Sequence, residues 1–489
     1  MKFFAACFLF LALLISSSNI LVAQEQPAED SLAITSTLVD TAGHTEDSPA
    51  AWSVLPFILL LLMTATGPLF YAHFWHKNYK LIALLFGVLV VLYYVFFLHN
   101  YHNPVHALAE YASFISLLTA LFVASGGIVI KVDTKGTPLA NSLLLVAGAA
   151  LANIIGTTGA SMLLIRPFMR LNKDRIEPYH IVFFIFIVSN VGGCLTPIGD
   201  PPLFIGFLKG VPFFWTVEHL WVKWFFGVGL LTLIFYIFDK TKHPKDKESF
   251  EHSGKIGIQG TMNLLWLGVV ILSVFLDPNL VDWLPYIPYH GDKISFVREA
   301  IMLTAAYFSY RTSDKDCLKA NEFNFEPIKE VAFLFAGIFM TMMPALQLIS
   351  EFARAHGEAF TQTTLFWGSG VLSSVLDNAP TYLNFLSAGL GRAGLSIEVK
   401  EDVVAFALGT TPMGIDTVER LIAVSVGSVF FGACTYIGNA PNFMVKAIAE
   451  QAGIKMPSFF GYVFRYTIPF LLPVLFLTWL VFIYFGVAV

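Results

Sequence analysis

A nine-residue phrase occurs twice in this chain, each time inside a long apolar stretch. Residues 196–204 read Thr-Pro-Ile-Gly-Asp-Pro-Pro-Leu-Phe, and residues 435–443 read Thr-Tyr-Ile-Gly-Asn-Ala-Pro-Asn-Phe. Glycine and proline both interrupt a helix, because one adds backbone freedom and the other removes an N–H donor. A pair of interrupted hydrophobic segments at corresponding places in two halves of a chain indicates the binding site of a secondary transporter.

The composition places the chain in a membrane. Of its 489 residues, 56% are hydrophobic and 13% are charged, whereas soluble domains carry about 25% charged residues. Many apolar runs approach the roughly 20 residues that cross a bilayer as a helix. The sequence therefore predicts an all-α polytopic membrane protein. Its four cysteines lack the spacing of a disulfide framework or a metal site.

The first residues resemble a targeting segment. Lys2 precedes a short apolar run, and small residues end at Ala23, which favours a signal peptide over 1–23. An uncleaved first helix is the alternative. Residues 24–50 are polar and acidic, and such a composition cannot bury a core. We expect a disordered extracytoplasmic tail there.

The apolar runs predict about ten transmembrane helices and two re-entrant hairpins, which enter and leave on one side. The hairpins are expected at 138–165 and 360–388. The spans are expected at 54–72, 80–98, 107–130, 179–210, 215–238, 261–277, 294–310, 328–350, 420–450 and 465–487.

The distribution of lysine and arginine orients these spans. With the mature N-terminus outside, most basic residues fall in predicted cytoplasmic segments, as in inner-membrane proteins. The most basic loop suggests a cytoplasmic linker at 239–260 between two repeats, 51–238 and 261–489. Each repeat has five spans. Because five is odd, the second repeat starts on the opposite side of the membrane from the first. The prediction is a 5+5 inverted-topology repeat.

Four breaks are expected at membrane depth: the two hairpin tips and the two copies of the repeated phrase. Irregular backbone at this depth is tolerated only inside protein or beside a wet cavity. Free carbonyls there can coordinate a cation, and free N–H groups at half-helix starts can hold an anion. The backbone alone leaves the sign of the substrate open.

The acidic residues at these breaks are the strongest functional candidates. Asp200 lies in the first broken helix, opposite Asn439 in the second, and Asp377 lies at the second hairpin tip. A carboxylate at mid-membrane costs roughly 2.5–3.5 kcal/mol on insertion scales. Such a group can bind either Na⁺ or H⁺. Hydroxyl and amide groups expected to complete an oxygen shell are Asn153, Thr157, Thr158, Thr196, Asn378, Thr381, Thr435 and Asn439.

Two further charged residues receive weaker interpretations. Lys209, which follows the first broken helix, is expected to anchor a helix end. Glu110 lies within a predicted span and is a less favoured candidate for a proton relay.

The segments at the four breaks resemble the ion transporter superfamily, within it NhaD-type sodium:proton antiporters and citrate-transporter-like permeases. The resemblance covers about residues 51–489 and rests on Asn153-Ile-Ile-Gly-Thr-Thr-Gly, Ser373-Ser-Val-Leu-Asp-Asn-Ala-Pro-Thr and the two repeated phrases. It implies a homodimer that works by an elevator motion. It also implies ion and substrate sites at the residues named above.

One departure favours cation exchange. The dicarboxylate branch of the superfamily carries Ser-Asn-Thr at both tips, whereas this chain has Asp377 at the second. The prediction is sodium:proton antiport without a cofactor, Na⁺ and H⁺ being the cargo. Cation-coupled transport of citrate or another carboxylate is the alternative. Export of arsenite or another anion and intramembrane aspartyl proteolysis are less favoured, and no nucleic-acid partner is expected.

Overall fold

The computed structural model describes residues 48–132, 136–173, 175–242, 256–278, 281, 283–289 and 292–487. The predicted signal peptide and most of the predicted tail lie outside these residues. At the end of the tail, Ser48 donates a hydrogen bond to Glu351.

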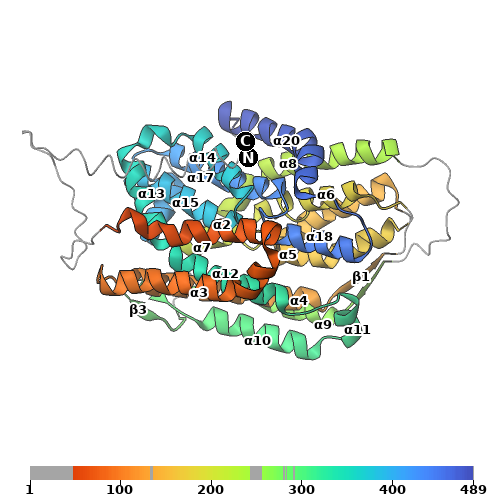
Figure 1. Ribbon diagram of the computed structural model, residues 1–489, viewed down its shortest axis with the longest axis horizontal. Coiled ribbons are helices and arrows are strands. Elements are labelled where there is room, and N and C mark those ends of the chain that lie inside the picture. Colours follow the sequence, from red (N-terminus) through yellow and green to blue (C-terminus); the bar gives the residue numbers. More distant parts are fainter. Residues whose placement is uncertain are drawn as a thin grey trace, which may run out of the picture.

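Most of the described chain is helical, and the helices run roughly along one common axis (Figure 1). The α-helices are α2 (Leu55–Phe70), α3 (Ala72–Phe96), α4 (His102–Gly126), α5 (Pro138–Leu171), α6 (Pro178–Ile187), α7 (Pro201–Lys209), α8 (Trp215–Lys242), α9 (Thr261–Ser273), α10 (Val297–Thr312), α11 (Lys315–Ala320), α12 (Glu326–Thr341), α13 (Met343–Ala355), α14 (Gln362–Ser373), α15 (Asn378–Arg392), α16 (Lys400–Leu408), α17 (Ile415–Phe431), α18 (Ala440–Gln451), α19 (Phe459–Tyr462) and α20 (Leu472–Thr478). Short 3₁₀ turns are η1 (Ala51–Val54), η2 (Val191–Leu195), η3 (Gly357–Ala359) and η4 (Gly432–Cys434), and π-helical turns are η5 (Val463–Leu471) and η6 (Trp479–Tyr484).

Two small antiparallel sheets lie at opposite ends of the helical body (Figure 1). β1 (Val129–Val132) pairs with β2 (Ile256–Gln259), and β3 (Ile287–Tyr289) pairs with β4 (Asp292–Ile294). The first sheet joins the chain just before α5 to the predicted linker. The apolar pattern predicted no strands in these segments. The predicted linker also begins inside α8, which continues to Lys242.

The protein is an all-α polytopic membrane protein. Among the described residues, eight helical segments are long and apolar enough to cross a membrane, or nine if the bent pair α12 and α13 is one span. Two predicted spans, α9 and α10, have only 13 and 16 residues, fewer than the roughly 20 that a full crossing needs. The number of full spans and their inverted orientation therefore stay predictions.

The first hairpin is present and consists of the two arms of α5, which meet at a kink. Asn141 and Asn172, near the two ends of α5, exchange amide hydrogen bonds of 2.9 and 2.8 Å. In a straight helix these residues would be about 46 Å apart, at 1.5 Å per residue. The reversal occurs at Gly156, whose φ of 77° and ψ of 155° are not helical. Only glycine adopts such a conformation without strain.

A buried polar cluster fixes the base of this hairpin against α8. The Asp239 carboxylate, which is fully buried, accepts hydrogen bonds from Arg175 at 2.6 and 2.7 Å. Tyr179 and Asn141 donate to the same carboxylate at 2.7 and 3.0 Å. A buried carboxylate is tolerated only with such partners, so the cluster holds the hairpin ends in one position.

The second hairpin consists of α14 and α15, which pack against each other. A Cβ atom added to Gly368 in α14 would lie 2.7 Å from the ring of Phe385 in α15, so the helices approach closely. The region between α15 and α17, for which no span was predicted, contains the additional helix α16.

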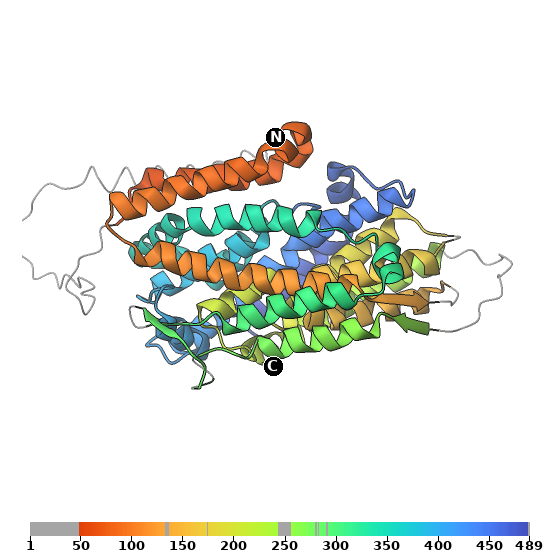
Figure 2. The ribbon, with the colours of Figure 1, turned by 90° about the horizontal axis from the view of Figure 1, so that it is seen from below.

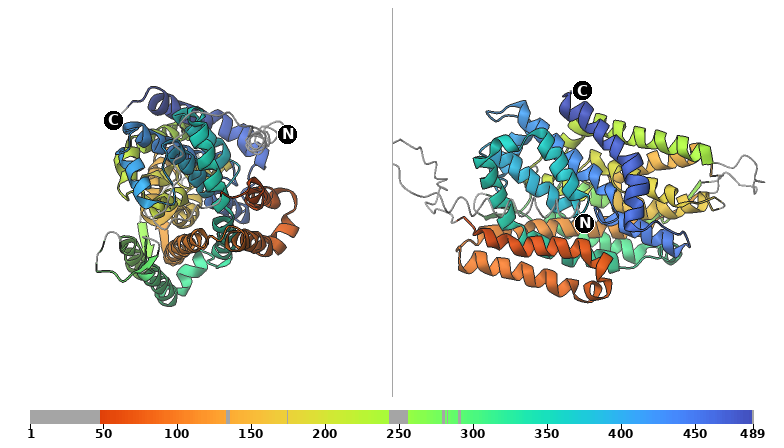
Figure 3. Two further views of the ribbon diagram at one scale, coloured as in Figure 1. Left: turned by 90° about the vertical axis from the view of Figure 1, so that its left-hand side faces the viewer. Right: turned by 45° about the horizontal axis from the view of Figure 1, so that its top comes forward.

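The two halves interlock around the breaks. The broken helix of the first half, α7, packs against α15, and α18 of the second half packs against α5. Each hairpin thus contacts the broken helix of the other half. The other helices surround this centre, with α2 and α3 at one outer edge (Figures 2 and 3). This arrangement places all four breaks close together.

Candidate functional site

The repeated phrases form helix breaks with the same local geometry. In the first, α6 ends at Ile187, η2 follows, and α7 starts after Asp200. In the second, α17 ends at Phe431, η4 follows, and α18 starts after Asn439. Asp200 and Asn439 therefore hold equivalent N-cap positions, both in extended backbone.

Paired glycines allow the chain to fold tightly within each break. A Cβ atom on Gly199 would lie 2.2 Å from the carbonyl oxygen of Gly193, and one on Gly438 would lie 2.6 Å from that of Gly432. Any larger residue at Gly199 or Gly438 would collide with backbone. Gly199 and Gly438 occupy the same position in the two copies of the phrase, and Gly193 and Gly432 each lie three residues before it.

A threonine ties each break to its own hairpin tip. Thr196 Oγ1 donates to the backbone oxygen of Asn153, and Thr435 Oγ1 donates to that of Ser374, both at 2.6 Å. Asn153 also accepts from the backbone N–H of Leu195 at 2.8 Å and donates to Gly192 at 2.7 Å. Asn153, Thr196 and Thr435 were predicted as ligands, but their polar groups form hydrogen bonds that position the hairpin tips.

The carboxylate of Asp200 is where the four breaks meet. It is 1% exposed. One oxygen, Oδ1, accepts hydrogen bonds from Thr157 Oγ1 and Asn439 Nδ2, both at 2.9 Å. The other, Oδ2, accepts from Asn378 Nδ2 at 2.6 Å. The donors come from the first hairpin tip, the second broken helix and the second hairpin tip.

Asp377 adjoins this cluster. Its side chain caps α15 by accepting a hydrogen bond from the backbone N–H of Ala379 at 3.0 Å. The next residue, Asn378, is the one that bonds to Asp200, which places the second hairpin tip beside that carboxylate. No lysine, arginine or histidine of the described residues forms an ion pair with either aspartate.

Asn378 carries an unused acceptor at this centre. Its side chain is fully buried, and its Oδ1 has no hydrogen-bond partner among the described residues. Buried polar atoms without a partner are rare in native proteins and call for an explanation. A bound cation or proton donor beside Asp200 would supply the missing partner.

The remaining predicted residues are more peripheral. Thr381 Oγ1 donates to the backbone oxygen of Asp377 at 2.9 Å, within its own helix. Thr158 is half-buried, and its hydroxyl makes no hydrogen bond within the described part of the chain.

Two asparagines that connect the halves were not among the predicted site residues. Asn190 Nδ2 donates to Asn442 Oδ1 at 2.7 Å, and Asn439 Nδ2 lies 3.2 Å from Asn190 Oδ1. Asn442 in turn donates to the backbone oxygens of Gly432 and Thr435. Asn190 is an amide in an apolar stretch, and Asn442 lies inside the second copy of the repeated phrase, so both positions could have drawn attention.

Most of the chain matches the model of a known family. Its model, described as putative citrate transport, matches residues 46–483. The chain belongs to this family. A member of the putative citrate transport family is expected to span the membrane several times, and the helices described above agree with that. The chain is also similar to a 46 kDa membrane protein of Mycobacterium leprae (strain TN), with 24% identity over 338 residues, which are 65% of this chain and 72% of the relative.

Proposed function

We propose that this protein is a secondary active transporter of the inner membrane that exchanges sodium for protons at Asp200. Membership of a transport family supports the general role. The specific proposal rests on the residues around Asp200. Asp200 and its three hydrogen-bond donors come from the four breaks, and no basic side chain of the described residues pairs with it.

The centre is better suited to a cation than to an anion. Helix N-termini usually attract anions through their free N–H groups, and α7, α15 and α18 all begin here. However, α7 starts with Pro201 and Pro202, which have no N–H to offer. The caps Asp200 and Asp377 add negative charge at the same place. Repulsion from these two carboxylates would therefore disfavour the binding of an anion at this place.

The side chains around Asp200 can serve both cargo ions. In the observed arrangement, amide N–H groups of Asn378 and Asn439 satisfy the carboxylate. Turning either amide by half a rotation about its last bond would present an oxygen instead, and the Oδ1 of Asn378 is already free. Together with the hydroxyl of Thr157, these oxygens form a shell of the kind that hard cations prefer.

Competition between the ions would couple their movement. Two neighbouring carboxylates repel each other when both are charged, so either a proton or a cation is needed to relieve the repulsion. Binding of Na⁺ would then release a proton, and protonation would release Na⁺. No resident cofactor is required, and Na⁺ and H⁺ are the cargo. The protein would work as a homodimer, in which the two hairpins of each subunit move together as one body to carry the ions across.

Everted vesicles that contain a pH-sensitive dye test this proposal. Addition of Na⁺ should dissipate an imposed proton gradient with the wild-type protein and fail to do so with Asp200→Asn. Glu326→Gln, which removes an exposed carboxylate paired with Lys329, is the matched control and should behave as wild type. Equal Na⁺-driven proton movement in wild type and Asp200→Asn would refute the proposal.

The family description favours a second candidate, cation-coupled transport of citrate or another carboxylate. In that case the cation at Asp200 would offset the negative charge of the substrate. Uptake of labelled citrate into right-side-out vesicles separates the two functions. Citrate accumulation that depends on Na⁺ or a proton gradient, without Na⁺-driven proton movement in the absence of citrate, would support the second.

A further inference from the structure

We propose that Asn190 and Asn442 are positioning residues for Asp200. They hold the amide of Asn439 as a fixed hydrogen-bond donor, so that coordination of the cation falls to the amide of Asn378. This role rests on the proposed exchange of Na⁺ and H⁺ at Asp200. Both amides donate to that carboxylate, Asn439 Nδ2 at 2.9 Å and Asn378 Nδ2 at 2.6 Å. Taken alone, either amide could turn and present its oxygen, but their other contacts differ.

The direction of the amide hydrogen bonds is set at Asn442. Its Nδ2 lies 2.8 Å from the backbone oxygen of Gly432 and 2.9 Å from that of Thr435. A backbone carbonyl can only accept a hydrogen bond, so the nitrogen of this amide faces the two carbonyls and its Oδ1 faces away from them. Asn442 is fully buried. Turning its amide would therefore bury three acceptors against one another, which is costly.

Asn190 passes this direction on to Asn439. The Nδ2 of Asn190 donates to Asn442 Oδ1 at 2.7 Å and to the backbone oxygen of Ile185 at 2.8 Å. Its Oδ1 therefore faces the next amide, and it lies 3.2 Å from the Nδ2 of Asn439. Because each amide has one donor end and one acceptor end, the orientation of Asn442 determines that of Asn439.

Asn439 consequently has one favourable orientation. Its Nδ2 faces the backbone oxygen of Ser189 at 3.2 Å, as well as the side-chain oxygens of Asn190 and Asp200. Turning this amide would replace three donor–acceptor contacts by contacts between oxygens in a buried centre. Asn439 therefore remains a donor to Asp200, and a hydrogen bond donated to a carboxylate favours its charged form.

Asn378 is under no such constraint. Its Nδ2 donates to Asp200, while its fully buried Oδ1 has no hydrogen-bond partner among the described residues. Turning this amide exchanges the nitrogen for the oxygen and breaks no other side-chain hydrogen bond. A hard cation beside Asp200 would then be bound by an amide oxygen and a carboxylate, which are the ligands that such ions prefer. Asn378 is therefore the amide that responds to the cation.

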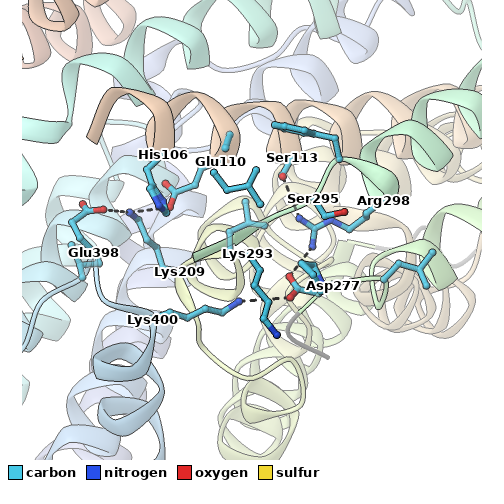
Figure 4. Close-up of a pocket in the computed structure, with 17 residues that line it drawn as sticks. His106, Glu110, Ser113, Lys209, Asp277, Lys293, Ser295, Arg298, Glu398 and Lys400 are labelled. Atoms are coloured by element: carbon cyan, nitrogen blue, oxygen red, sulfur yellow. Dashed lines mark hydrogen bonds and ion pairs between the residues drawn. The ribbon is translucent and has the colours of Figure 1, made fainter. Parts of the chain in front are cut away.

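The carboxylate itself is held in place, because α7 is fixed at both ends. Asp200 accepts its three hydrogen bonds at the start of the helix. At the other end, Lys209 is buried between Glu110 and Glu398 and pairs with them at 2.9 and 3.0 Å (Figure 4). In this arrangement the adjustment to a bound ion falls on side chains that can turn, and not on the helix.

Everted vesicles that contain a pH-sensitive dye, assayed over a range of pH and Na⁺ concentration, test the role of the two positioning residues. Asn190→Leu and Asn442→Leu release the amide of Asn439, and leucine is what the first copy of the phrase carries at the latter position, as Leu203. Asp200 would then hold its proton to a higher pH. The acid limb of the pH profile, where protonation stops Na⁺ binding, should move up by about one pH unit, a ten-fold change in proton affinity.

The apparent KM for Na⁺ at alkaline pH separates a donor from a ligand. There Asp200 is charged in every variant, so Asn190→Leu, Asn442→Leu and Asn439→Ala should keep the wild-type KM. Asn378→Ala removes a cation ligand and should raise the KM at least about ten-fold. A merely structural role for Asn190 and Asn442 would not shift the acid limb while leaving this KM unchanged.

Asn263→Ala is the matched control for the loss of a buried amide. Asn263 is fully buried in α9, outside the four breaks, and donates to the hydroxyls of Ser309 and Ser313 at 3.0 and 2.8 Å. Its removal should change neither the pH profile nor the KM for Na⁺.

Two results in an active wild-type protein would overturn the inference alone. One is an unchanged acid limb in either Asn190→Leu or Asn442→Leu. The other is an equal rise of the KM at alkaline pH in Asn439→Ala and Asn378→Ala. Absence of Na⁺-driven proton movement in wild type would instead refute the proposed function, and the inference with it.

Infrared difference spectroscopy decides the same question without the variants of Asn190 and Asn442, whose folding depends on buried hydrogen bonds. Asparagine labelled with ¹³C at the side-chain carbonyl is incorporated into the full-length protein in nanodiscs, and spectra in Na⁺ and in K⁺ are compared at alkaline pH. The difference should contain a labelled carbonyl band that persists in Asn439→Ala and vanishes in Asn378→Ala. Loss of the band in Asn439→Ala, or its persistence in Asn378→Ala, would overturn the inference.

Discussion

Asp200 and Asn439, which occupy the same position in the two copies of the repeated phrase, are joined by a hydrogen bond of 2.9 Å between Oδ1 and Nδ2. The contact runs between the two halves of the chain, across a sequence separation of 239 residues. A carboxylate in both positions would place two charges in direct contact. With aspartate in one copy and asparagine in the other, the two breaks can be in contact without charge repulsion, and Asp200 is the one titratable group of this pair.

The charge of Asp377 can be separated from its capping role. Asparagine is as good an N-cap as aspartate, so Asp377→Asn should preserve the start of α15 and remove only the negative charge. We expect it to abolish the dependence of transport on Na⁺ with little change in thermal stability. Asp377→Ala should lose the function and also about 0.5–2 kcal/mol of stability. Normal Na⁺-dependent transport by Asp377→Asn would show that its charge has no role.

Gly156→Ala should damage the first hairpin. The φ of 77° is unfavourable for any residue with a side chain, and a Cβ atom there would approach the carbonyl oxygen of Ile198 to 3.3 Å. We expect a loss of about 1–3 kcal/mol, the range for a strained backbone, and a strong loss of transport. Thermal unfolding and vesicle assays measure the two effects.

Gly268→Ala provides the matched control for this substitution. Gly268 lies in α9, and no heavy atom is within 4 Å of the position of its added Cβ. Alanine should therefore be neutral or stabilise the protein by about 0.4–1 kcal/mol. Equal stability of Gly156→Ala and Gly268→Ala would contradict the observed reversal at Gly156.

The two threonines that tie the breaks to the hairpin tips should be equivalent. Thr196→Val and Thr435→Val each remove a hydrogen bond of 2.6 Å to a backbone oxygen. Leaving a buried acceptor unsatisfied costs about 1–3 kcal/mol, and we expect both variants to fall in this range. Thr241→Val, which removes an exposed hydrogen bond of the same type in α8, should cost less. A large difference between Thr196→Val and Thr435→Val would argue against equivalent breaks.

The ion pair between Lys209 and Glu398 should make stability depend on pH. Burial raises the pKa of Glu398, but the adjacent Lys209 ammonium outweighs it and holds the pKa below its ordinary value. The pair therefore stabilises the fold fully above the ordinary glutamate pKa of about 4.3, and this contribution disappears as the pH falls through the lower value in the folded protein.

Glu398→Gln measures this contribution. The variant should melt below wild type at about pH 7, and the difference should shrink as the pH falls below about 4. Glu450→Gln is the control, because it removes a surface ion pair between Glu450 and Lys446, which lie four residues apart in one helix. It should change the free energy of unfolding by no more than about 0.5 kcal/mol. A difference between Glu398→Gln and wild type that grows on acidification would contradict a lowered pKa of Glu398 in the folded protein.

Apolar runs and helix breakers predicted the general layout because each acts locally. The runs of apolar residues indicated the membrane helices, and the glycine and proline of the repeated phrases indicated the breaks that precede α7 and α18. The same reasoning placed the first hairpin at 138–165, and Gly156 is the residue where the chain reverses. Local signals could not predict the strands β1 and β2, because their pairing joins segments far apart in the chain.

The sequence by itself determined that this chain is a helical membrane protein in which one phrase occurs twice, and that polar residues cluster at the helix breaks. Only the tertiary structure decided which of them meet. It showed that Thr157, Asn378 and Asn439 donate to Asp200, that Asn153, Thr196 and Thr435 position backbone instead, and that Asn190 and Asn442 bridge the halves. The physical reason is that a helix break depends on neighbouring residues, whereas the partner of a buried carboxylate depends on how four distant segments pack.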